Sequence, residues 1–361
     1  MPETAAARGQ EAQEIDWPRI DGVLFVRLRS IGDTVLMTPC LKALKSWRPD
    51  IKVTVASEPL AAPLLEGHPL VDRLVICGRS LGSRVRLIKD MRRLRFGLAV
   101  NLHGGSTATL ITALSGAKTT AGYSGYSYSW MQTIRVVSPD QVLGREQIHS
   151  VEQQLALLQW CGVPVPAPVS LQLPVCDRAA QSVHEKLAGL DRFAVISPAA
   201  AFESKQWPAE SYAAISDYAA RSKNLPCVVI AGPGQEQIAE NVARHSTSRP
   251  RVITGLTMTE LVALLASSSI FIGNDSGPMH IAAAFDRPIV AVFGASNPKV
   301  WHPWTRAKWS IPCCDVGGNP APSGGSFKRA GDLIGPALES IKLIPVDAVI
   351  QSVDDVLSNS D

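Results

Sequence analysis

Short, almost wholly apolar segments alternate with longer amphipathic segments, and this alternation restricts the fold more than any other feature of the chain. Runs of valine, isoleucine and leucine bounded by turn residues are typical of parallel strands that are covered on both faces by helices. Strands are predicted at 23–28, 52–57, 73–77, 98–102, 193–197, 227–231, 251–254, 270–273 and 289–294. Helices are predicted at 34–47, 81–94, 209–222, 235–245, 257–267, 277–285 and 346–357. The pattern predicts an α/β protein.

The alternation occurs twice, which predicts two domains. At 361 residues the chain is too long for one ordinary hydrophobic core. The stretch 162–175 has four prolines and little periodicity, so we predict an extended connection there. The predicted organisation is a disordered leader at 1–20, an N-terminal Rossmann-like domain at 21–165, a linker at 166–176, a C-terminal Rossmann-like domain at 177–344, and a helix with a tail at 345–361. Two such sheets are expected to face each other across a cleft, with ligands at the carboxyl ends of the strands.

Composition excludes several classes of function. The formal net charge is only +3, so nothing global indicates a nucleic-acid partner. Seven cysteines without any C-x-x-C spacing indicate reduced thiols and a cytoplasmic location rather than a disulfide framework or a zinc site. No apolar stretch reaches the roughly 18 residues that span a bilayer.

The junction FIGNDSGPMHIAAA at 271–284 joins a buried strand to a helix through small and polar residues. Asp275 or Ser276 can cap the helix, and the free N–H groups of a helix N-terminus attract phosphate. Gly277 allows a ligand to approach the backbone, and His280 in the first turn can reach the same anion. An ordinary capped helix with one semi-buried histidine is the alternative. The combination of these residue types at a strand's carboxyl end favours a phosphate site.

Two further loops of the second half follow predicted strands. Lys205 lies in the loop after 193–197, where it can neutralise a diphosphate; by itself it is equally a surface lysine. Glu236 follows the glycines of AGPGQEQ at 231–237 and can accept hydrogen bonds from ribose hydroxyls, although these glycines can also serve the turn alone.

In the first half, Asp33 follows Gly32 at the end of the first strand. Asp33 is either the N-cap of the next helix or a general base that points into the cleft. A carboxylate at a helix N-terminus has a lowered pKa, so it is ionised and only weakly basic. It can still accept a proton late in a reaction whose leaving group departs first. Arg29 is close enough in sequence to pair with Asp33 or with an anionic acceptor.

Two common nucleotide-binding patterns are missing. The loop after the first strand, RSIGDTVLMTP, has a single glycine instead of G-x-G-x-x-G, and the second-half loops also lack this fingerprint. No G-x-x-x-x-G-K-[ST] phosphate loop occurs either. Nicotinamide-dependent redox chemistry and P-loop hydrolysis are therefore disfavoured.

Four stretches give the chain a resemblance to one family. They are RSIGDTVLMTPCLKALK, HSVEQQLALLQWCGVP, SKQWPAE and GNDSGPMHIAAAFDRPIVAVFGASNP. They resemble glycosyltransferase family 9, the ADP-heptose:lipopolysaccharide heptosyltransferases, and the resemblance extends from about residue 22 to 357. It implies a GT-B fold and an inverting, metal-independent transfer from a nucleotide-activated sugar, which is ADP-heptose in the best-known members. The nucleotide-sugar is then a co-substrate, and no cofactor or metal ligand is expected.

The resemblance also implies roles for individual residues. The N-terminal domain would hold the acceptor and the C-terminal domain the nucleotide-sugar. Asp33 matches the family's catalytic base. The diphosphate site is matched by Lys205 and His280, together with the amides near Ser276 and Gly277. Asp275 matches the residue that holds sugar hydroxyls, and Glu236 matches the ribose contact. The chain departs from the family at 199–201, where three alanines replace hydroxyl side chains and Ser204 is the nearest hydroxyl. A sugar-nucleotide epimerase of the same architecture stays open, and the missing hydroxyls also leave open a non-catalytic nucleotide-sugar-binding relative.

Two segments bear on partners. The stretch 79–97 is strongly basic, with Arg84, Arg86, Lys89, Arg92, Arg93 and Arg95 around a predicted helix. It is either a solvated helix face or a surface attracted to anionic lipid of the inner membrane, where a lipopolysaccharide or other lipid-linked acceptor resides. The aromatic and glycine-rich stretch 122–130 contains Tyr123 and Tyr126, which together with Arg29 are predicted to contact the acceptor.

Overall fold

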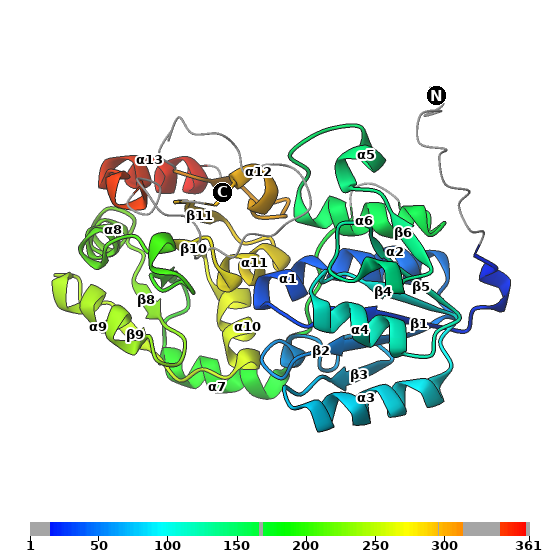
Figure 1. Ribbon diagram of the computed structural model, residues 1–361. Helices are drawn as coiled ribbons and strands as arrows, with labels where there is room; N and C mark the ends of the chain where they lie inside the picture. The colour runs from blue at the N-terminus through cyan, green and yellow to red at the C-terminus, as the bar shows by residue number, and fades with distance from the viewer. Residues whose placement is uncertain (1–14, 166–168, 295, 313–339, 359–361) are drawn as a thin grey trace. The chain divides into compact units, whose positions relative to one another are not determined.

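The computed structural model describes residues 15–165, 169–294, 296–312 and 340–358 (Figure 1). These residues form two compact units, one ending at Ser170 and the other beginning at Leu171. Within the described part of the chain, each unit contains a six-stranded sheet in which all paired strands are parallel. The prediction of an α/β protein with two Rossmann-like sheets is therefore confirmed.

The sheet of the N-terminal unit has the strand order β3-β2-β1-β4-β5-β6. Its strands are β1 (Gly22–Val26), β2 (Lys52–Ser57), β3 (Arg73–Ile76), β4 (Leu98–Asn101), β5 (Thr119–Tyr123) and β6 (Ile134–Val136). This is the Rossmann order, in which the direction of strand addition reverses between β1 and β4. Loops that leave the carboxyl ends of these two strands diverge to opposite faces, and the space between them is where such sheets bind ligands.

Helices cover both faces of this sheet (Figure 1). They are η1 (Trp17–Arg19), α1 (Ile31–Leu36), α2 (Thr38–Trp47), η2 (Ala62–Leu64), α3 (Leu81–Leu94), α4 (Ser106–Leu114), η3 (Ser129–Met131), α5 (Pro139–Leu143) and α6 (Ser150–Trp160). On one face, Leu24 and Val26 of β1 share a buried cluster with Leu87 and Met91 of α3 and with Ile111 of α4. On the other face, α2 packs against α6.

The sheet of the C-terminal unit has the order β12-β11-β10-β7-β8-β9, which repeats the Rossmann order with its reversal between β7 and β10. Its strands are β7 (Ala194–Ser197), β8 (Cys227–Ile230), β9 (Arg251–Ile253), β10 (Ile270–Asn274), β11 (Ile289–Val292) and β12 (Trp309–Ser310). The central strands are fully buried, as the predicted apolar runs require.

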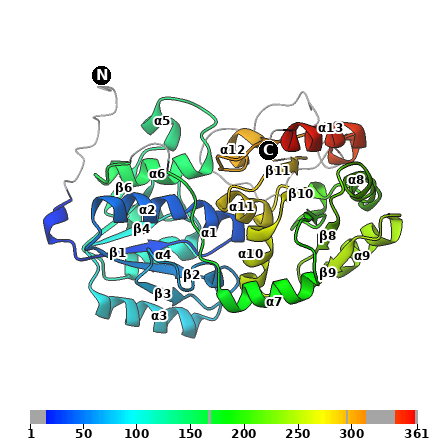
Figure 2. The same ribbon diagram turned by 180° about the vertical axis from the view of Figure 1, so that it is seen from behind.

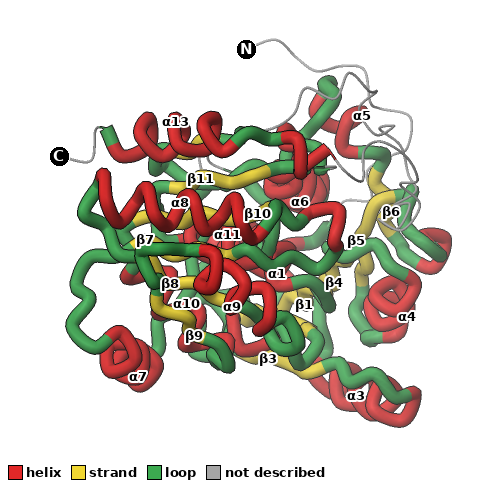
Figure 3. Tube along the Cα trace, turned by 90° about the vertical axis from the view of Figure 1, so that its left-hand side faces the viewer, coloured by secondary structure: helices red, strands yellow, loops and turns green. Residues whose placement is uncertain are grey.

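Helices of the C-terminal unit also lie on both faces of their sheet (Figure 2). They are α7 (Asp177–Leu187), η4 (Glu203–Lys205), α8 (Ala209–Ser222), α9 (Glu236–His245), α10 (Met258–Ser267), α11 (Gly277–Ala284), α12 (Pro298–Trp301), η7 (Ser340–Leu343) and α13 (Val346–Leu357). Side chains of α8, α9 and α13 share one core with the strands, whereas α10 packs against α7 and α11. Figure 3 shows the helices in red and the strands in yellow.

Some boundaries differ from those predicted. The predicted helix 34–47 begins earlier, at Ile31, and is divided at Met37 into α1 and α2, because Pro39 stands in the first turn of α2. The leader predicted over 1–20 is also too long. Trp17 is buried in η1, and its indole N–H donates to the Cys161 carbonyl at 2.8 Å. The described residues do not include 1–14, the start of the predicted linker (166–168) or 313–339.

Candidate active site

A salt bridge joins two of the predicted donor-site residues at the strand reversal of the C-terminal unit. Lys205 follows β7 and Asp275 follows β10, and Lys205 Nζ lies 2.6 Å from Asp275 Oδ2. The Asp275 side chain is only 8% exposed, whereas that of Lys205 is 26% exposed. A buried carboxylate is tolerated when it has such a partner. The loop after β7 therefore brings one cation to the end of β10.

Asn274, which sequence reasoning missed, attaches this loop to the sheet. Its side chain is fully buried, and Oδ1 accepts hydrogen bonds from the Trp207 N–H (3.2 Å) and the Tyr212 hydroxyl (2.7 Å). Its Nδ2 donates to the Pro198 carbonyl at 2.8 Å. An asparagine at the end of an apolar strand was the available signal, because a buried amide needs hydrogen-bond partners.

The N-terminus of α11 has one side-chain hydroxyl that makes no hydrogen bond within the described part of the chain. Ser276 is the N-cap, but its side chain makes no capping hydrogen bond, and Ser276 Oγ has no partner among the described residues. Gly277 is the first helical residue, so no side chain separates its N–H from a ligand. His280 lies in the first turn and is 4% exposed. Together with the helix dipole, these groups form an environment that suits an anion.

The loop that lacks hydroxyl side chains is held through its backbone. Ala199 and Ala200 are buried. The side-chain amides of Gln206 and Gln235 both donate to the Ala200 carbonyl, at 2.9 and 2.8 Å. Glu236, the first residue of α9, accepts a hydrogen bond from the Gly234 N–H at 3.0 Å. Its own backbone N–H and that of Gly234 lower the pKa of Glu236, so it is ionised.

In the N-terminal unit, Asp33 is the third residue of α1 and not its N-cap. Ser30 is the N-cap, and the Asp33 carboxylate accepts hydrogen bonds from the Ser30 N–H (3.3 Å) and hydroxyl (3.1 Å). Arg27 forms a salt bridge with the same carboxylate and donates to the Leu102 carbonyl. Burial would raise the pKa of Asp33, but the charge of Arg27 and the Ser30 hydrogen bonds outweigh it and hold the pKa below its usual value.

Arg29 does not pair with Asp33. Its side chain is 66% exposed and lies 3.6 Å from the carboxylate of Glu58. Arg27, which is 7% exposed, takes the position beside Asp33 that we predicted for Arg29. The signal that was missed is the charge itself, because a guanidinium inside an apolar run such as VLFVRL must find a partner.

The two predicted tyrosines are packed into the same unit. Tyr123 ends β5, is 4% exposed, and donates its hydroxyl to the Gln153 carbonyl. The ring of Tyr126 meets that of Tyr123 edge-on at 5.6 Å between centroids. Gly104 has φ +80°, and a Cβ there would lie 2.7 Å from the Tyr126 ring. Burial raises the pKa of Tyr126 to about 12, so its hydroxyl stays protonated.

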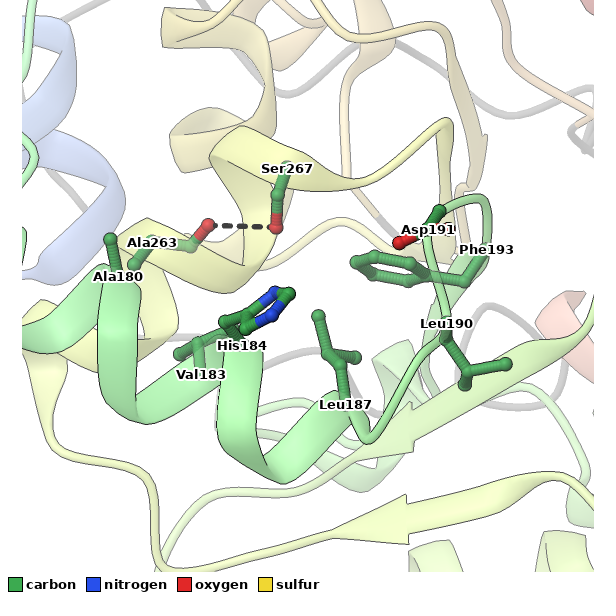
Figure 4. Close-up of a pocket in the computed structure, with 9 residues that line it drawn as sticks. All are labelled: Ala180, Val183, His184, Leu187, Leu190, Asp191, Phe193, Ala263 and Ser267. Carbon is green, nitrogen blue, oxygen red and sulfur yellow. Dashed lines mark hydrogen bonds between the residues drawn. The ribbon is translucent and has the colours of Figure 1, made fainter.

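A separate hollow of about 280 Å³ lies between α7 and α10 (Figure 4). His184, Leu187, Phe193 and Ser267 are among its lining residues. Phe193 and Ser267 precede β7 and β10, whereas Lys205 and Asp275 follow these strands. The hollow is therefore at the amino edge of the sheet and is not part of the candidate site.

Two further features concern metals and membranes. In residues 15–165, 169–294, 296–312 and 340–358, no three side chains of His, Cys, Asp or Glu are grouped so that they could hold a metal ion. None of the helices in these same ranges combines the length and the apolar character that a bilayer crossing requires.

Comparisons with known proteins agree with this fold. The sequence model of glycosyltransferase family 9 (heptosyltransferase) matches residues 84–315. Lipopolysaccharide heptosyltransferase 3 of Escherichia coli (strain K12) is 28% identical over an alignment of 297 residues, and the match covers 77% of this chain and 84% of that protein. The solved glycosyl transferase family 9 structure from Veillonella parvula DSM 2008 has a TM-score of 0.80 at 22% identity. The match covers 94% of this chain and 98% of the Veillonella chain.

The solved E. coli ADP-heptose lps heptosyltransferase II has a TM-score of 0.76 at 20% identity, with 93% of this chain and 98% of that chain covered. These structural likenesses show that the chain has the GT-B fold. The family match contains Lys205, Glu236, Asp275 and His280 but begins after Asp33. Because it covers more than half of the chain, the prediction of a glycosyltransferase is confirmed. The chain belongs to glycosyltransferase family 9, the heptosyltransferase family.

Proposed function

We propose that the chain transfers a heptose or a related sugar from ADP-heptose to a lipopolysaccharide core-type acceptor, with inversion at the anomeric carbon and without a metal ion. The observation that carries this proposal is the N-terminus of α11. There, the unpartnered Ser276 hydroxyl and the helix N–H groups follow directly after the Lys205–Asp275 salt bridge. Family membership and the names of the relatives support the choice of sugar and acceptor.

The donor's diphosphate would bind at the start of α11. The Ser276 hydroxyl and the Gly277 N–H would donate hydrogen bonds to it, and Lys205 and His280 would complete the site. Asp275 would hold sugar hydroxyls, and Glu236 the ribose. Cationic and N–H groups placed there would stabilise the charge on the departing nucleotide.

Asp33 would act as the base. A carboxylate has about four lone-pair sites, and Arg27, the Ser30 N–H and the Ser30 hydroxyl already use three of those on Asp33. The acceptor hydroxyl would use the remaining one, since the side chain is 23% exposed. The oxygen of the acceptor hydroxyl forms the new bond to the anomeric carbon while the bond between that carbon and the diphosphate breaks. ADP leaves with the electron pair, and the hydroxyl proton passes to Asp33.

The test is the Asp33→Asn variant. It should bind ADP-heptose as the wild type does, because the donor residues lie in the other unit, and its turnover should fall about 10²–10⁴-fold. Asp140→Asn, at the start of α5, is the matched control and should keep full activity. Full turnover of Asp33→Asn would refute the base role.

Two measurements on the wild type test the inversion at the anomeric carbon and the independence of a metal ion. The anomeric configuration of the product, determined by NMR, should be inverted, and transfer should persist in excess EDTA. Conversion of a UDP-sugar with no acceptor present would instead identify an epimerase. Binding of ADP-heptose without transfer to truncated lipopolysaccharide would identify a non-catalytic relative.

We also propose that α3 holds the enzyme at the cytoplasmic face of the inner membrane. Leu87 and Met91 of α3 are buried against the sheet, whereas four basic residues of this helix are exposed: Arg86, Lys89, Arg92 and Arg93. Leu81 and Val85 at the start of the same helix are 78% and 44% exposed. Basic residues near an anionic lipid surface each contribute about 1 kcal/mol of attraction.

Co-sedimentation with vesicles tests this surface. The protein should bind phosphatidylcholine vesicles that contain phosphatidylglycerol and not vesicles of phosphatidylcholine alone, and added salt should release it. The combined Arg86→Gln, Lys89→Gln and Arg93→Gln substitutions should abolish this binding. The same number of substitutions at Arg178, Arg221 and Arg244 is the control for net charge. Equal losses in the two variants would assign the binding to net charge and not to α3.

A further inference from the structure

His103 lies at the strand reversal of the N-terminal unit, and neither the sequence motifs nor the family match assigns it a role. It follows β4, the strand next to β1. The buried Asn101 fixes the turn, because its Oδ1 accepts hydrogen bonds from the N–H groups of His103 (3.0 Å) and Gly104 (3.1 Å). Asn101 Nδ2 in turn donates to Thr109 Oγ1 at 3.0 Å. The hydrogen bonds of Asn101 therefore fix the turn that carries His103, and the His103 side chain is only partly buried.

The tautomer of this imidazole follows from its one hydrogen bond. His103 Nδ1 lies 3.1 Å from the Arg29 carbonyl oxygen. A carbonyl oxygen only accepts, so Nδ1 carries the proton and donates. Burial and the charge of Arg27 lower the pKa of His103 to about 4, against the opposing influence of Asp33. The ring is therefore neutral near pH 7, and Nε2 presents a lone pair. Among the described residues, none donates a hydrogen bond to Nε2.

His103 is connected to Asp33 through the loop that follows β1. His103 binds the backbone of Arg29, and the next residue, Ser30, donates twice to the Asp33 carboxylate. The Asp33 carboxyl and the His103 imidazole also influence each other's pKa. Two groups that accept hydrogen bonds are therefore fixed by neighbouring residues of one loop. A ligand that satisfies both must supply two donors, as the hydroxyl groups of a sugar do, whereas a phosphate or carboxylate supplies none.

We propose that His103 Nε2 accepts a hydrogen bond from a second hydroxyl of the acceptor sugar and so orients the attacking hydroxyl toward Asp33. This inference rests on the proposed function of the Asp33 site. It defines the acceptor more narrowly, as a sugar that presents two hydroxyl groups to this edge of the sheet. It also gives His103 direct contact with the substrate, in contrast to Arg27, which acts through Asp33.

Two substitutions separate this role from a structural one. Asparagine places its amide nitrogen near the position of Nδ1, so His103→Asn keeps the donor to the Arg29 carbonyl and loses the Nε2 acceptor. Glutamine places its amide group near Nε2, so His103→Gln keeps an acceptor there and loses the Nδ1 donor. Loss of one such hydrogen bond weakens binding by about tenfold. We expect kcat/KM for the acceptor to fall by about that factor in His103→Asn and clearly less in His103→Gln.

The measurements use purified full-length protein and the oligosaccharide released from truncated lipopolysaccharide. Acceptor affinity is titrated directly, as well as kcat/KM, and ADP affinity should stay unchanged in both variants. A larger loss in His103→Gln, an equal loss in the two variants, or no loss in either would overturn the proposal. Because acceptor affinity does not depend on turnover, the result remains interpretable even if Asp33→Asn proves fully active and the base role fails.

Discussion

The ionisation state of Asp33 depends more on Arg27 than on any other residue. Its guanidinium is almost fully buried, and it binds both the Asp33 carboxylate and the Leu102 carbonyl. A buried ion pair of this kind contributes little net stability compared with an apolar pair, but removal of one partner leaves the other charge unpaired. The positive charge therefore keeps Asp33 ionised within a partly buried site.

Replacement of Arg27 by methionine should change stability and pH dependence together. We expect Arg27→Met to lower the free energy of unfolding by about 3–5 kcal/mol, as loss of one member of a buried pair does. The pKa of Asp33 should rise, because burial would no longer be opposed by a neighbouring cation. Activity needs the ionised carboxylate, so the acid limb of kcat/KM should move to higher pH than in the wild type.

Urea titrations and pH–rate profiles of wild type, Arg27→Met and Arg27→Lys measure these effects. Arg27→Lys keeps the positive charge but loses the planar guanidinium, whose two terminal nitrogens contact the Asp33 carboxylate and the Leu102 carbonyl. Its free energy of unfolding and its acid limb should therefore lie between those of the wild type and Arg27→Met. An unchanged acid limb in Arg27→Met would show that Arg27 does not set the pKa of Asp33.

The position of the loop after β7 depends on one side chain of β10. Asn274 binds Pro198, Trp207 and Tyr212 simultaneously. Asn274→Ala should lower the free energy of unfolding by about 2–4 kcal/mol, because three buried groups lose their partner. Tyr212→Phe removes only one of these hydrogen bonds and should cost about 1 kcal/mol. Denaturant unfolding checks both, and equal effects would show that the loop is held elsewhere.

The start of α10 predicts a dependence of stability on pH. The first turn of this helix has a capping box: the Glu260 N–H donates to Thr257 Oγ1 (3.2 Å), and the Thr257 N–H donates to the Glu260 carboxylate (2.8 Å). Hydrogen bonds from Lys186 and then Ser182 contribute most to lowering the pKa of Glu260 to about 2. Because this pKa lies below that of the unfolded chain, the stabilisation is present above pH ~4.5 and is lost as the pH falls toward 2.

Glu260→Gln should therefore lower the free energy of unfolding by about 1–2 kcal/mol at pH 7. The difference from the wild type should shrink between pH ~4.5 and pH ~2. Thermal unfolding across this range measures it, with Glu240→Gln on the exposed side of α9 as the control. A difference that is constant with pH would contradict the assignment.

The elements were more predictable than their contacts. The bounds of β2, α3, α8 and α13 agree with the predicted ranges to the residue, because apolar runs and helical periods mark them directly. The strands β5, β6 and β12 were not predicted, since sequences such as TTAGY and IRV are short and carry polar or small residues. In the site, Lys205 and Asp275 were predicted, but the roles of Arg27 and Asn274 depend on which distant loops meet, and local pattern does not encode this.

Both units use the same strand order, and each places its candidate residues at the reversal of that order. ADP-heptose should therefore protect the loops after β7, β8 and β10 from hydrogen exchange and leave the Asp33 loop unchanged when no acceptor is present. At a ligand concentration of 100 Kd the stabilisation should be about 2.7 kcal/mol.

Lys205→Met should remove this protection, but it also leaves Asp275 without its cation. The double variant Lys205→Met with Asp275→Asn corrects for this, because it should recover stability without recovering ADP-heptose binding. Recovery of binding in the double variant would show that Lys205 only neutralises Asp275. Hydrogen exchange followed by mass spectrometry and calorimetric titration supply the two readouts.

The loop after β7 is fastened by the carbonyl of Ala200 and not by the side chains at 199–201. Ala199 and Ala200 are buried but Ala201 is exposed, so substitution of Ala201 can alter the surface of this loop while the path of the backbone stays the same. Selection for a different activated sugar has an accessible starting point at Ala201, since its side chain can change without the loop losing its attachment.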